Sequence, residues 1–205
     1  MLTNKSVTEF LAETASNQPV PGGGSVAAMC GALAASLGAM VANLTIGRKK
    51  YADVEETMRR IAGEFDKARS KFEEYINLDA LAYAHVMEAY RMPKETPEEL
   101  QARNNAIAEA TFHAAEVPMT VALEAARIMS LIERVALEGN RNAVTDACVA
   151  MMNARTAVLG AVLNTRINLV NLPETDEIAD MNHRCQLLVQ QAIEQEQQLL
   201  SAITI

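Results

Sequence analysis

Apolar residues recur at intervals of three and four positions along most of this chain, which is the period of an amphipathic α-helix. No Asn-Gly or Asp-Gly pair marks a tight hairpin, and runs of β-branched residues are short. Ser6 and Glu9 fit a capping box, and Thr96 precedes Pro97 and two acidic residues, so both positions are typical of helix starts. Pro118 either kinks or splits the helix that begins at Pro97. The predicted helices cover about 6–17, 25–46, 51–90, 97–137, 143–170 and 174–202.

The segment predicted as the second helix carries no charged residue. Gly24, Gly31 and Gly38 recur every seven residues, and each is followed four residues later by an alanine, so one stripe lacks bulky side chains and lets another helix approach closely. The segment is long enough to cross a bilayer. We nevertheless expect it to be buried in a soluble bundle, because small residues dominate it, no aromatic belt flanks it and no second segment of this kind is evident.

These patterns predict an all-α fold. With 205 residues, of which 50% are hydrophobic, the chain is long enough for one sizeable core. No repeat, low-complexity tract or domain linker is apparent. We therefore expect a single helical domain over 1–205, built as a bundle of about six to seven helices with long antiparallel members.

Asp79 interrupts the apolar stripe of the helix predicted over 51–90. Steps of four and three residues lead from Phe72 through Tyr75 to Asp79 and on to Ala82, which is the spacing of a heptad seam. A carboxylate on such a seam loses water on folding, which is costly unless it is paired or protonated. One interpretation is a general acid/base with a raised pKa, with Tyr83 one turn further on as a hydrogen-bond donor. The alternative is a structural carboxylate that pairs with a base or caps a neighbouring helix.

A polar stripe marks the helix predicted over 143–170. At about 100° per residue, Asn142, Asp146, Asn153, Gly160 and Asn164 fall within about 40° of one another on an otherwise apolar helix. Buried amides must be hydrogen-bonded, and asparagine both donates and accepts, so this row suits a heterocycle with mixed edges. The stripe is alternatively the solvent side of the helix, although it carries only one charge.

Two further segments are candidates for binding. The loop that ends in Gly22, Gly23, Gly24 and Ser25 precedes a helix and can present backbone amides to an anion or carbonyl, or it is simply a turn. It matches neither a Walker A motif nor a dinucleotide-binding motif.

Three consecutive bases, Arg48, Lys49 and Lys50, follow the uncharged helix. They either complement the helix dipole or hold carboxylates of a substrate tail.

Composition narrows the classes of function. A formal net charge of −8 disfavours a nucleic-acid partner, which needs a basic face. The three cysteines and three histidines form no metal-binding spacing, so we expect no metal and no permanently bound cofactor. No signal peptide is evident, and the cysteines suit a reducing compartment, so we expect a cytoplasmic protein without a membrane partner.

An ordered set of motifs resembles the formimidoyltetrahydrofolate cyclodeaminase family. The set covers nearly the whole chain, and although no single motif is decisive, their order is specific. The motifs are the loop from Pro19 to Ser25, Gly47 to Tyr51, Asp79 to Tyr83, Met92 to Lys94 with Thr96 and Glu99, Val117 with Pro118, and Gly139 to Asn142 with Thr145 and Asp146.

That resemblance implies an all-α homodimer with a folate site near the subunit interface. The family also includes standalone methenyltetrahydrofolate cyclohydrolases. We therefore expect the chain to cyclise 5-formimidoyltetrahydrofolate to 5,10-methenyltetrahydrofolate with release of ammonia; the alternatives are cyclohydrolase action at the same site, or a non-catalytic folate-binding module. Asp79 is the first candidate for the catalytic group and Asp146 the second.

The remaining candidates would bind the folate, with or without a polyglutamate tail. The loop glycines and the asparagines would hold the pterin and its amide, and the three bases would meet the glutamate carboxylates. Lys94 and Asn140, which lie within the matching motifs, join Tyr83 and the residues above as candidate substrate-binding residues.

Overall fold

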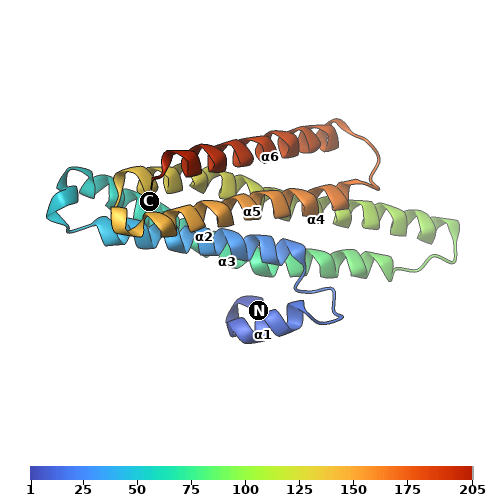
Figure 1. Cartoon of the computed structure of the whole chain (residues 1–205). Helices are drawn as coiled ribbons and strands as arrows, with labels where there is room; N and C mark the ends of the chain where they lie inside the picture. The colour runs from blue at the N-terminus through green and yellow to red at the C-terminus, as the bar shows by residue number, and fades with distance from the viewer. Residues whose placement is uncertain (205) are drawn as a thin grey trace.

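Capping residues set the ends of the helices where the sequence predicts them. Ser6 and Glu9 form a capping box at α1, Thr96 and Glu99 form another at α4, and the side chain of Thr175 caps α6. The computed structural model describes residues 1–204, which form six α-helices and no strand, so the predicted all-α class is confirmed (Figure 1). The helices are α1 (Val7–Thr14), α2 (Gly23–Thr45), α3 (Glu55–Tyr90), α4 (Pro97–Glu138), α5 (Val144–Leu169) and α6 (Asp176–Ala202). Short 3-10 turns at Leu2–Asn4, Lys49–Val54 and Arg141–Ala143 complete them.

Pro118 does not split α4, which runs unbroken over 42 residues. Proline removes one backbone hydrogen bond from a helix interior. Here Pro118 is buried, as are Ala115, Met119 and Ala122 around it. Because packing of an apolar face supplies most of a helix's stability in a protein, this burial keeps α4 continuous across the proline.

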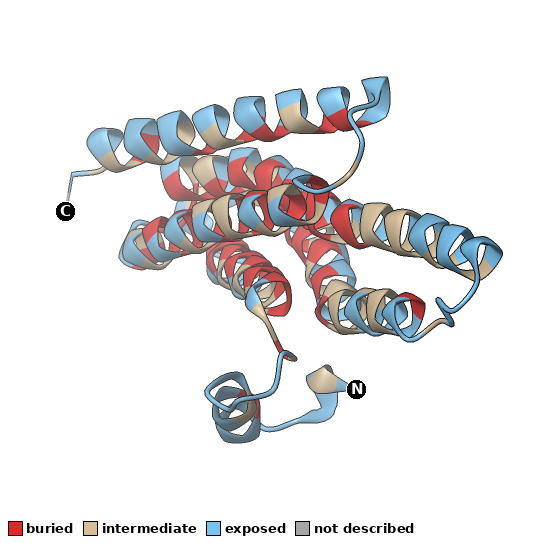
Figure 2. Cartoon of the chain, turned by 90° about the vertical axis from the view of Figure 1, so that its right-hand side faces the viewer, coloured by how far each residue is buried: buried red, intermediate tan, exposed pale blue. Residues whose placement is uncertain are grey.

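The core lies between α2, α3, α4 and α5, and α6 covers the outer side of α4 and α5 (Figures 1 and 2). Figure 2 shows the buried residues on the facing sides of these helices and exposed residues along the outside of α6. The largest fully buried side chains include Phe65, Phe72 and Met58 from α3 and Ile128 and Met129 from α4. The predicted seam of α3 is therefore its buried face.

The glycine stripe of α2 packs directly against the seam of α3, as its small residues predict. A β-carbon at Gly31 would lie 2.6 Å from the Phe72 ring, and one at Gly38 would lie 2.5 Å from the Phe65 ring. Both glycines therefore have to lack a side chain for the two helices to approach this closely. The pairs are separated by seven residues on each helix, so α2 and α3 run antiparallel in a regular register.

Our expectation of a single membrane-length apolar segment was incomplete. Two segments, Gly23–Thr45 and Arg141–Leu169, are long and apolar enough to cross a bilayer. In their most apolar stretches, 56% and 50% of the residues are buried inside the bundle, as is typical of core helices. The second segment was not predicted from the sequence because the charged residues Arg155 and Arg166 lie within it.

The other side of α2 and α5 forms an exposed surface that we call the apolar face. Leu163 and Ile167 on α5 are 66% and 67% exposed, and Leu33 on α2 is 50% exposed. The exposed apolar residues of the two helices are Leu33, Met40, Leu44, Val149, Met152, Leu163 and Ile167.

The helices α3 and α4 extend well beyond the start of α2. At about 1.5 Å per residue, α3 is roughly 54 Å long and α4 roughly 63 Å, against roughly 35 Å for α2. The parts of α3 and α4 beyond the start of α2 form an arm, which Figure 1 shows in green at the right of the bundle. The base of this arm, where α2 begins, is the level of Asp79.

Candidate functional site

Asp79 lies over the first turn of α2. A β-carbon at Gly24 would overlap the Asp79 carboxylate, and the hydroxyl of Ser25 donates a hydrogen bond of 2.8 Å to Asp79 Oδ2. The same hydroxyl lies 3.1 Å from the carbonyl oxygen of Ile76, one turn before Asp79 on α3. The glycine loop therefore allows the carboxylate to approach the helix start, and Ser25 holds it there.

The environment of Asp79 favours its protonated form. Burial raises the pKa of this carboxyl above its usual value, and the hydroxyl and backbone amide of Ser25 oppose that rise without cancelling it. Within residues 1–204, Asp79 forms no ion pair, so no base of the same chain pairs with it. Its carboxyl lies at the N-terminus of α2 and accepts hydrogen bonds from Ser25, as a helix-capping residue does. Asp79 therefore has a structural role as well as the perturbed pKa of a candidate acid/base.

Asn164 on α5 lies at the same level of the bundle as Asp79 and the start of α2. A β-carbon at Gly23 would lie 3.1 Å from Asn164 Nδ2, which already donates a 2.8 Å hydrogen bond to the carbonyl of Gly160. Gly160 in turn packs against Ala27 of α2, where a β-carbon on the glycine would lie 3.3 Å from that of Ala27. The structure thus brings together Gly22 to Ser25, Asp79 and Asn164, which come from three separate helices.

Tyr83 does not make the hydrogen bond to Asp79 that its spacing suggested. Its side chain is 39% exposed and forms no hydrogen bond with the described part of the chain. It lies one turn beyond Asp79 at the base of the arm, where it remains a candidate for contact with a ligand.

A second group of predicted site residues lies at the far end of the bundle. Arg48, Lys49 and Lys50 follow the C-terminus of α2 and are exposed, without an ion pair in the described residues. Asp146 is half-buried in the first turn of α5, at the same end. Since α2 is roughly 35 Å long, this basic cluster does not reach Asp79 within one chain.

Asn140 has a structural role at this far end. Its backbone amide donates to Thr45 Oγ1 at 2.8 Å, and its side-chain amide donates to the Leu44 carbonyl at 3.0 Å. Its side-chain oxygen caps the following turn through the amide of Asn142. Asn140 is thus fully engaged in joining the end of α2 to the start of α5, while the side chain of Asn142 is exposed.

Two predicted binding residues lie apart from both groups. Asn153 is in the middle of α5 and donates a 2.9 Å hydrogen bond to the Val149 carbonyl of its own helix. Lys94 is exposed in the turn between α3 and α4, at the tip of the arm. The polar residues of α5 thus share one face of the helix, but they are spread along its length and do not form one site.

A pocket of about 460 Å³ opens on the arm, further from the bundle than Asp79, and we call it the amide pocket. Five neutral polar residues line it: Tyr90 on α3, Asn104 and Thr111 on α4, and Asn168 and Asn171 at the end of α5. Its apolar walls come from residues that include Val86, Ile107, Leu172 and Pro173. Sequence reasoning missed these polar residues, although Asn168 and Asn171 follow Asn164 at the helical spacing of four and seven.

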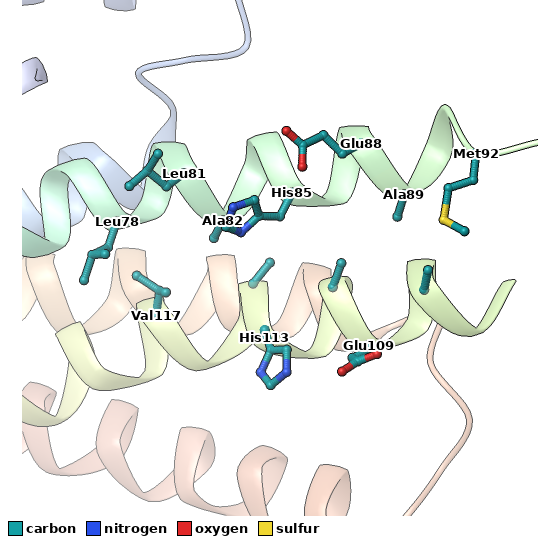
Figure 3. Close-up of a pocket in the computed structure, with 13 residues that line it drawn as sticks. Leu78, Leu81, Ala82, His85, Glu88, Ala89, Met92, Glu109, His113 and Val117 are labelled. Carbon is teal, nitrogen blue, oxygen red and sulfur yellow. The ribbon is translucent and has the colours of Figure 1, made fainter. Parts of the chain in front are cut away.

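A larger hollow of about 570 Å³ lies between α3 and α4 on another side of the arm. Figure 3 shows Ala82 and Ala89 facing α4, whereas Glu88, Glu109 and His113 point away from the space between the helices. We call this the alanine groove. It offers little polar chemistry, and the described residues contain no group of His, Cys, Asp and Glu side chains able to hold a metal ion.

Comparisons with known proteins agree on one family. A family model for formiminotransferase-cyclodeaminase matches residues 6–187. A methenyltetrahydrofolate cyclohydrolase from Methylorubrum extorquens is 38% identical over 174 residues, which cover 85% of this chain and 84% of that protein. The crystal structure of formiminotetrahydrofolate cyclodeaminase from Thermotoga maritima has a TM-score of 0.82 at 28% identity, covering 98% of each chain.

Bifunctional relatives match over a shorter part of their length. The formimidoyltransferase-cyclodeaminase of Mus musculus is 34% identical over 191 residues, which cover 93% of this chain but 35% of that protein. The chain therefore spans about a third of the length of these relatives. The similarity covers Asp79 and the residues around it.

Proposed function

Because this chain belongs to the formiminotransferase-cyclodeaminase family, we propose that it is an enzyme of folate one-carbon chemistry in which Asp79 is the acid/base group. The observation that carries the proposal is the placement of Asp79: a half-buried carboxyl with a raised pKa, without an ion pair among residues 1–204, held by Ser25 against a glycine-lined helix start. A carboxylate that is removed from water without a base of its own chain beside it is costly to the fold, which is typical of a functional group.

The cyclodeaminase reaction needs one group that moves a proton twice. The formimidoyl group reacts in its protonated amidinium form. N10 of 5-formimidoyltetrahydrofolate attacks the formimidoyl carbon, and the ionised Asp79 takes the N10 proton as the ring closes, which leaves a neutral amino group on that carbon. The carboxylic acid then returns that proton to the exocyclic nitrogen, which leaves as ammonia, and the product is the cationic 5,10-methenyl compound. Such proton transfer contributes roughly 10²–10⁴-fold, and ionised Asp79 also stabilises the developing cation.

Cyclohydrolase action is the second candidate, and the 38% identity to a cyclohydrolase over most of both chains favours keeping it. Water adds to the methenyl carbon while Asp79 accepts its proton. Asp79 then protonates N5 as the bond between N5 and this carbon breaks. The added hydroxyl group loses its proton to solvent as the formyl C=O forms, which gives 10-formyltetrahydrofolate. Both reactions place the same carboxyl beside N5 and N10, so they share one site.

A homodimer is supported by the apolar face. Leu163 and Ile167 are about two-thirds exposed, and no charged residue interrupts the exposed side of α2. A contiguous surface of this kind marks a protein or membrane interface. The polar residues Ser36 and Asn43 within it suit a protein partner better than lipid, and we assign it to a second copy in the cytoplasm.

A twofold axis perpendicular to α2 at mid-helix would bring the basic cluster of one subunit to the Asp79 level of the other. A twofold axis parallel to α2 would instead place Arg48, Lys49 and Lys50 of both subunits side by side. Their like charges would repel, so this arrangement is unfavourable. In the first arrangement the partner's bases meet the glutamate carboxylates of the folate, including a polyglutamate tail. The two separated groups of predicted residues then form one site per subunit.

The test follows the absorbance of the methenyl chromophore. Wild-type protein should generate the chromophore from 5-formimidoyltetrahydrofolate, or speed its decay when given 5,10-methenyltetrahydrofolate. Asp79→Asn should lose at least 100-fold in rate while folate binding and the helical circular-dichroism signal persist. The matched control is Asp66→Asn, an exposed carboxyl on the same helix. Near-wild-type turnover by Asp79→Asn would refute the assignment, and folate binding without turnover by the wild type would favour the non-catalytic module.

A further inference from the structure

The amide pocket has the chemistry of a site for a flat, neutral heterocycle. No charged side chain lines it, and its polar residues are three asparagines, one threonine and one tyrosine. In the described chain, the side chains of Asn104, Thr111 and Asn171 form no hydrogen bond with protein, so their donors and acceptors are available to a ligand. Amides both donate and accept, which matches a ring with alternating donor and acceptor positions along one edge.

The rise of the helices gives the position of the amide pocket relative to Asp79. Asn168 lies one turn beyond Asn164, and its side chain is fixed by a 2.9 Å hydrogen bond to the Ala114 carbonyl. Val86 lies two turns beyond Asp79 on α3, or roughly 10 Å along the helix. The near end of the pocket therefore begins roughly 6–10 Å beyond the level of the carboxyl, and its far end lies further along the arm, at Tyr90 and Asn104.

The far end is held in place by Arg103. Its guanidinium donates hydrogen bonds of 3.3 and 3.0 Å to the Tyr90 carbonyl and lies 5.5 Å from the centre of the Tyr90 ring. The two Arg103 nitrogens that face Tyr90 are therefore already hydrogen-bonded. The contacts join the end of α3 to α4 beside Asn104. The wall of the pocket is thereby fixed without placing a charge inside it.

We propose that the amide pocket holds the pterin ring of the folate substrate, with the amino-pyrimidinone edge toward Asn104 and Asn171 and the N5 side toward Asp79. This inference rests on the proposed function. N5 belongs to the pterin ring and N10 is one methylene away, so a ring in this pocket presents both reacting nitrogens to the base of the arm. The glutamate end then leads away from the pocket, which has no cation to receive it.

Two alanines on α4 provide a matched pair of variants. Ala108 lines the amide pocket and Ala110 lines the alanine groove, and both are half-buried. The probes are the two halves of the substrate, 6-methyltetrahydropterin and p-aminobenzoylglutamate, titrated separately by calorimetry. Ala108→Phe should weaken binding of the pterin probe at least 10-fold, whereas Ala110→Phe should change it less than twofold. Neither variant should alter binding of p-aminobenzoylglutamate by more than twofold.

A second pair covers the case in which Ala108→Phe fails to fold. The double variant Asn104→Leu with Thr111→Val keeps side-chain size while removing the hydrogen-bonding groups, and Asn105→Leu is its control on the exposed side of α4. Loss of pterin affinity in the double variant alone supports the proposal. Equal pterin affinity in all variants overturns it, even if turnover still depends on Asp79. Conversely, pterin binding that requires the pocket, in a protein without methenyl turnover, would refute the proposed reaction and leave the pocket assignment standing.

Discussion

The carboxylate of Asp79 occupies the space in which Gly24 would carry its side chain. It takes the place that Phe72 and Phe65 hold over Gly31 and Gly38, one and two heptads further along the same pair of helices. This close approach of α2 and α3 therefore ends on an ionisable group instead of an aromatic ring. The position combines removal from water with the first turn of a helix, whose free amides attract negative charge.

Gly24→Ala is expected to displace the carboxylate. The added methyl group overlaps Asp79, so α2 and α3 must separate or the Asp79 side chain must rotate. We expect a loss of about 1–3 kcal/mol in the free energy of unfolding, and a fall in turnover of roughly 100-fold. Gly63→Ala is the control, because a β-carbon there meets nothing within 4 Å on α3 and should stabilise the protein by about 0.5–1 kcal/mol. Chemical denaturation and the chromophore assay measure both effects, and equal behaviour of the two variants would contradict this account.

The raised pKa of Asp79 predicts a pH-dependent cost to the folded state. The carboxyl binds its proton more tightly when folded than when unfolded, where its pKa is near 3.8. Its contribution to stability is therefore complete below that pH and is lost as pH rises through the higher folded pKa. Asp79→Asn removes this loss, so the variant should melt at a higher temperature than the wild type at pH 7. The difference should shrink as the pH falls toward 4, and thermal melts over pH 4–8 would show otherwise if it stayed constant.

Ser25→Ala should shift the pH–rate profile. The Ser25 hydroxyl lowers the pKa of Asp79, opposing the effect of burial, so its loss lets that pKa rise further. If Asp79 is ionised when N10 attacks, the acidic limb of the profile should move to higher pH. A merely structural role for Ser25 would lower the rate at all pH values and leave the limb in place. Rescue by Ser25→Thr, which keeps the hydroxyl, would strengthen the assignment.

Leu163→Glu should disrupt the homodimer. The leucine is 66% exposed on the uncharged exposed side of α5, and a glutamate there would place a charge, removed from water, where the interface is apolar. Leu187→Glu is the control, because Leu187 is 53% exposed on α6, away from the apolar face. Light scattering after size exclusion should give a dimer for the wild type and the control, and a monomer for Leu163→Glu. A wild-type monomer would contradict the arrangement.

Local sequence signals predicted the helices and their main contact well. The capping boxes at Ser6 and Thr96 fixed two starts to the residue, because a cap is a short-range hydrogen-bond pattern. The seven-residue repeat of glycine on α2 and the heptad seam of α3 share one period, so their packing followed from the sequence. Asp79 stood out for the same reason, as the one polar member of a regular apolar series.

The composition of the site was harder to predict. Helical phase shows which residues share a face and says nothing about distance along the axis, so Asp146 and Asn164 appeared together although they lie roughly 27 Å apart. Asn104 and Thr111 gave no signal because they border a pocket only when α4 extends past the ends of α2 and α5. Such a pocket depends on the relative lengths of helices that are distant in sequence.

The heptad spacing of the three glycines has a further consequence for how α2 and α3 find their alignment. A slide of one heptad would set Phe72 over Gly24 or Asp79 over Gly31, and both fits are sterically similar to the native one. Only Gly24 is followed by a hydroxyl, since Ala32 and Ala39 take the place of Ser25 beside the other two glycines. A single polar pair on an apolar seam specifies register in paired helices. The carboxyl proposed to carry the proton thus also selects the one alignment in which its own site exists.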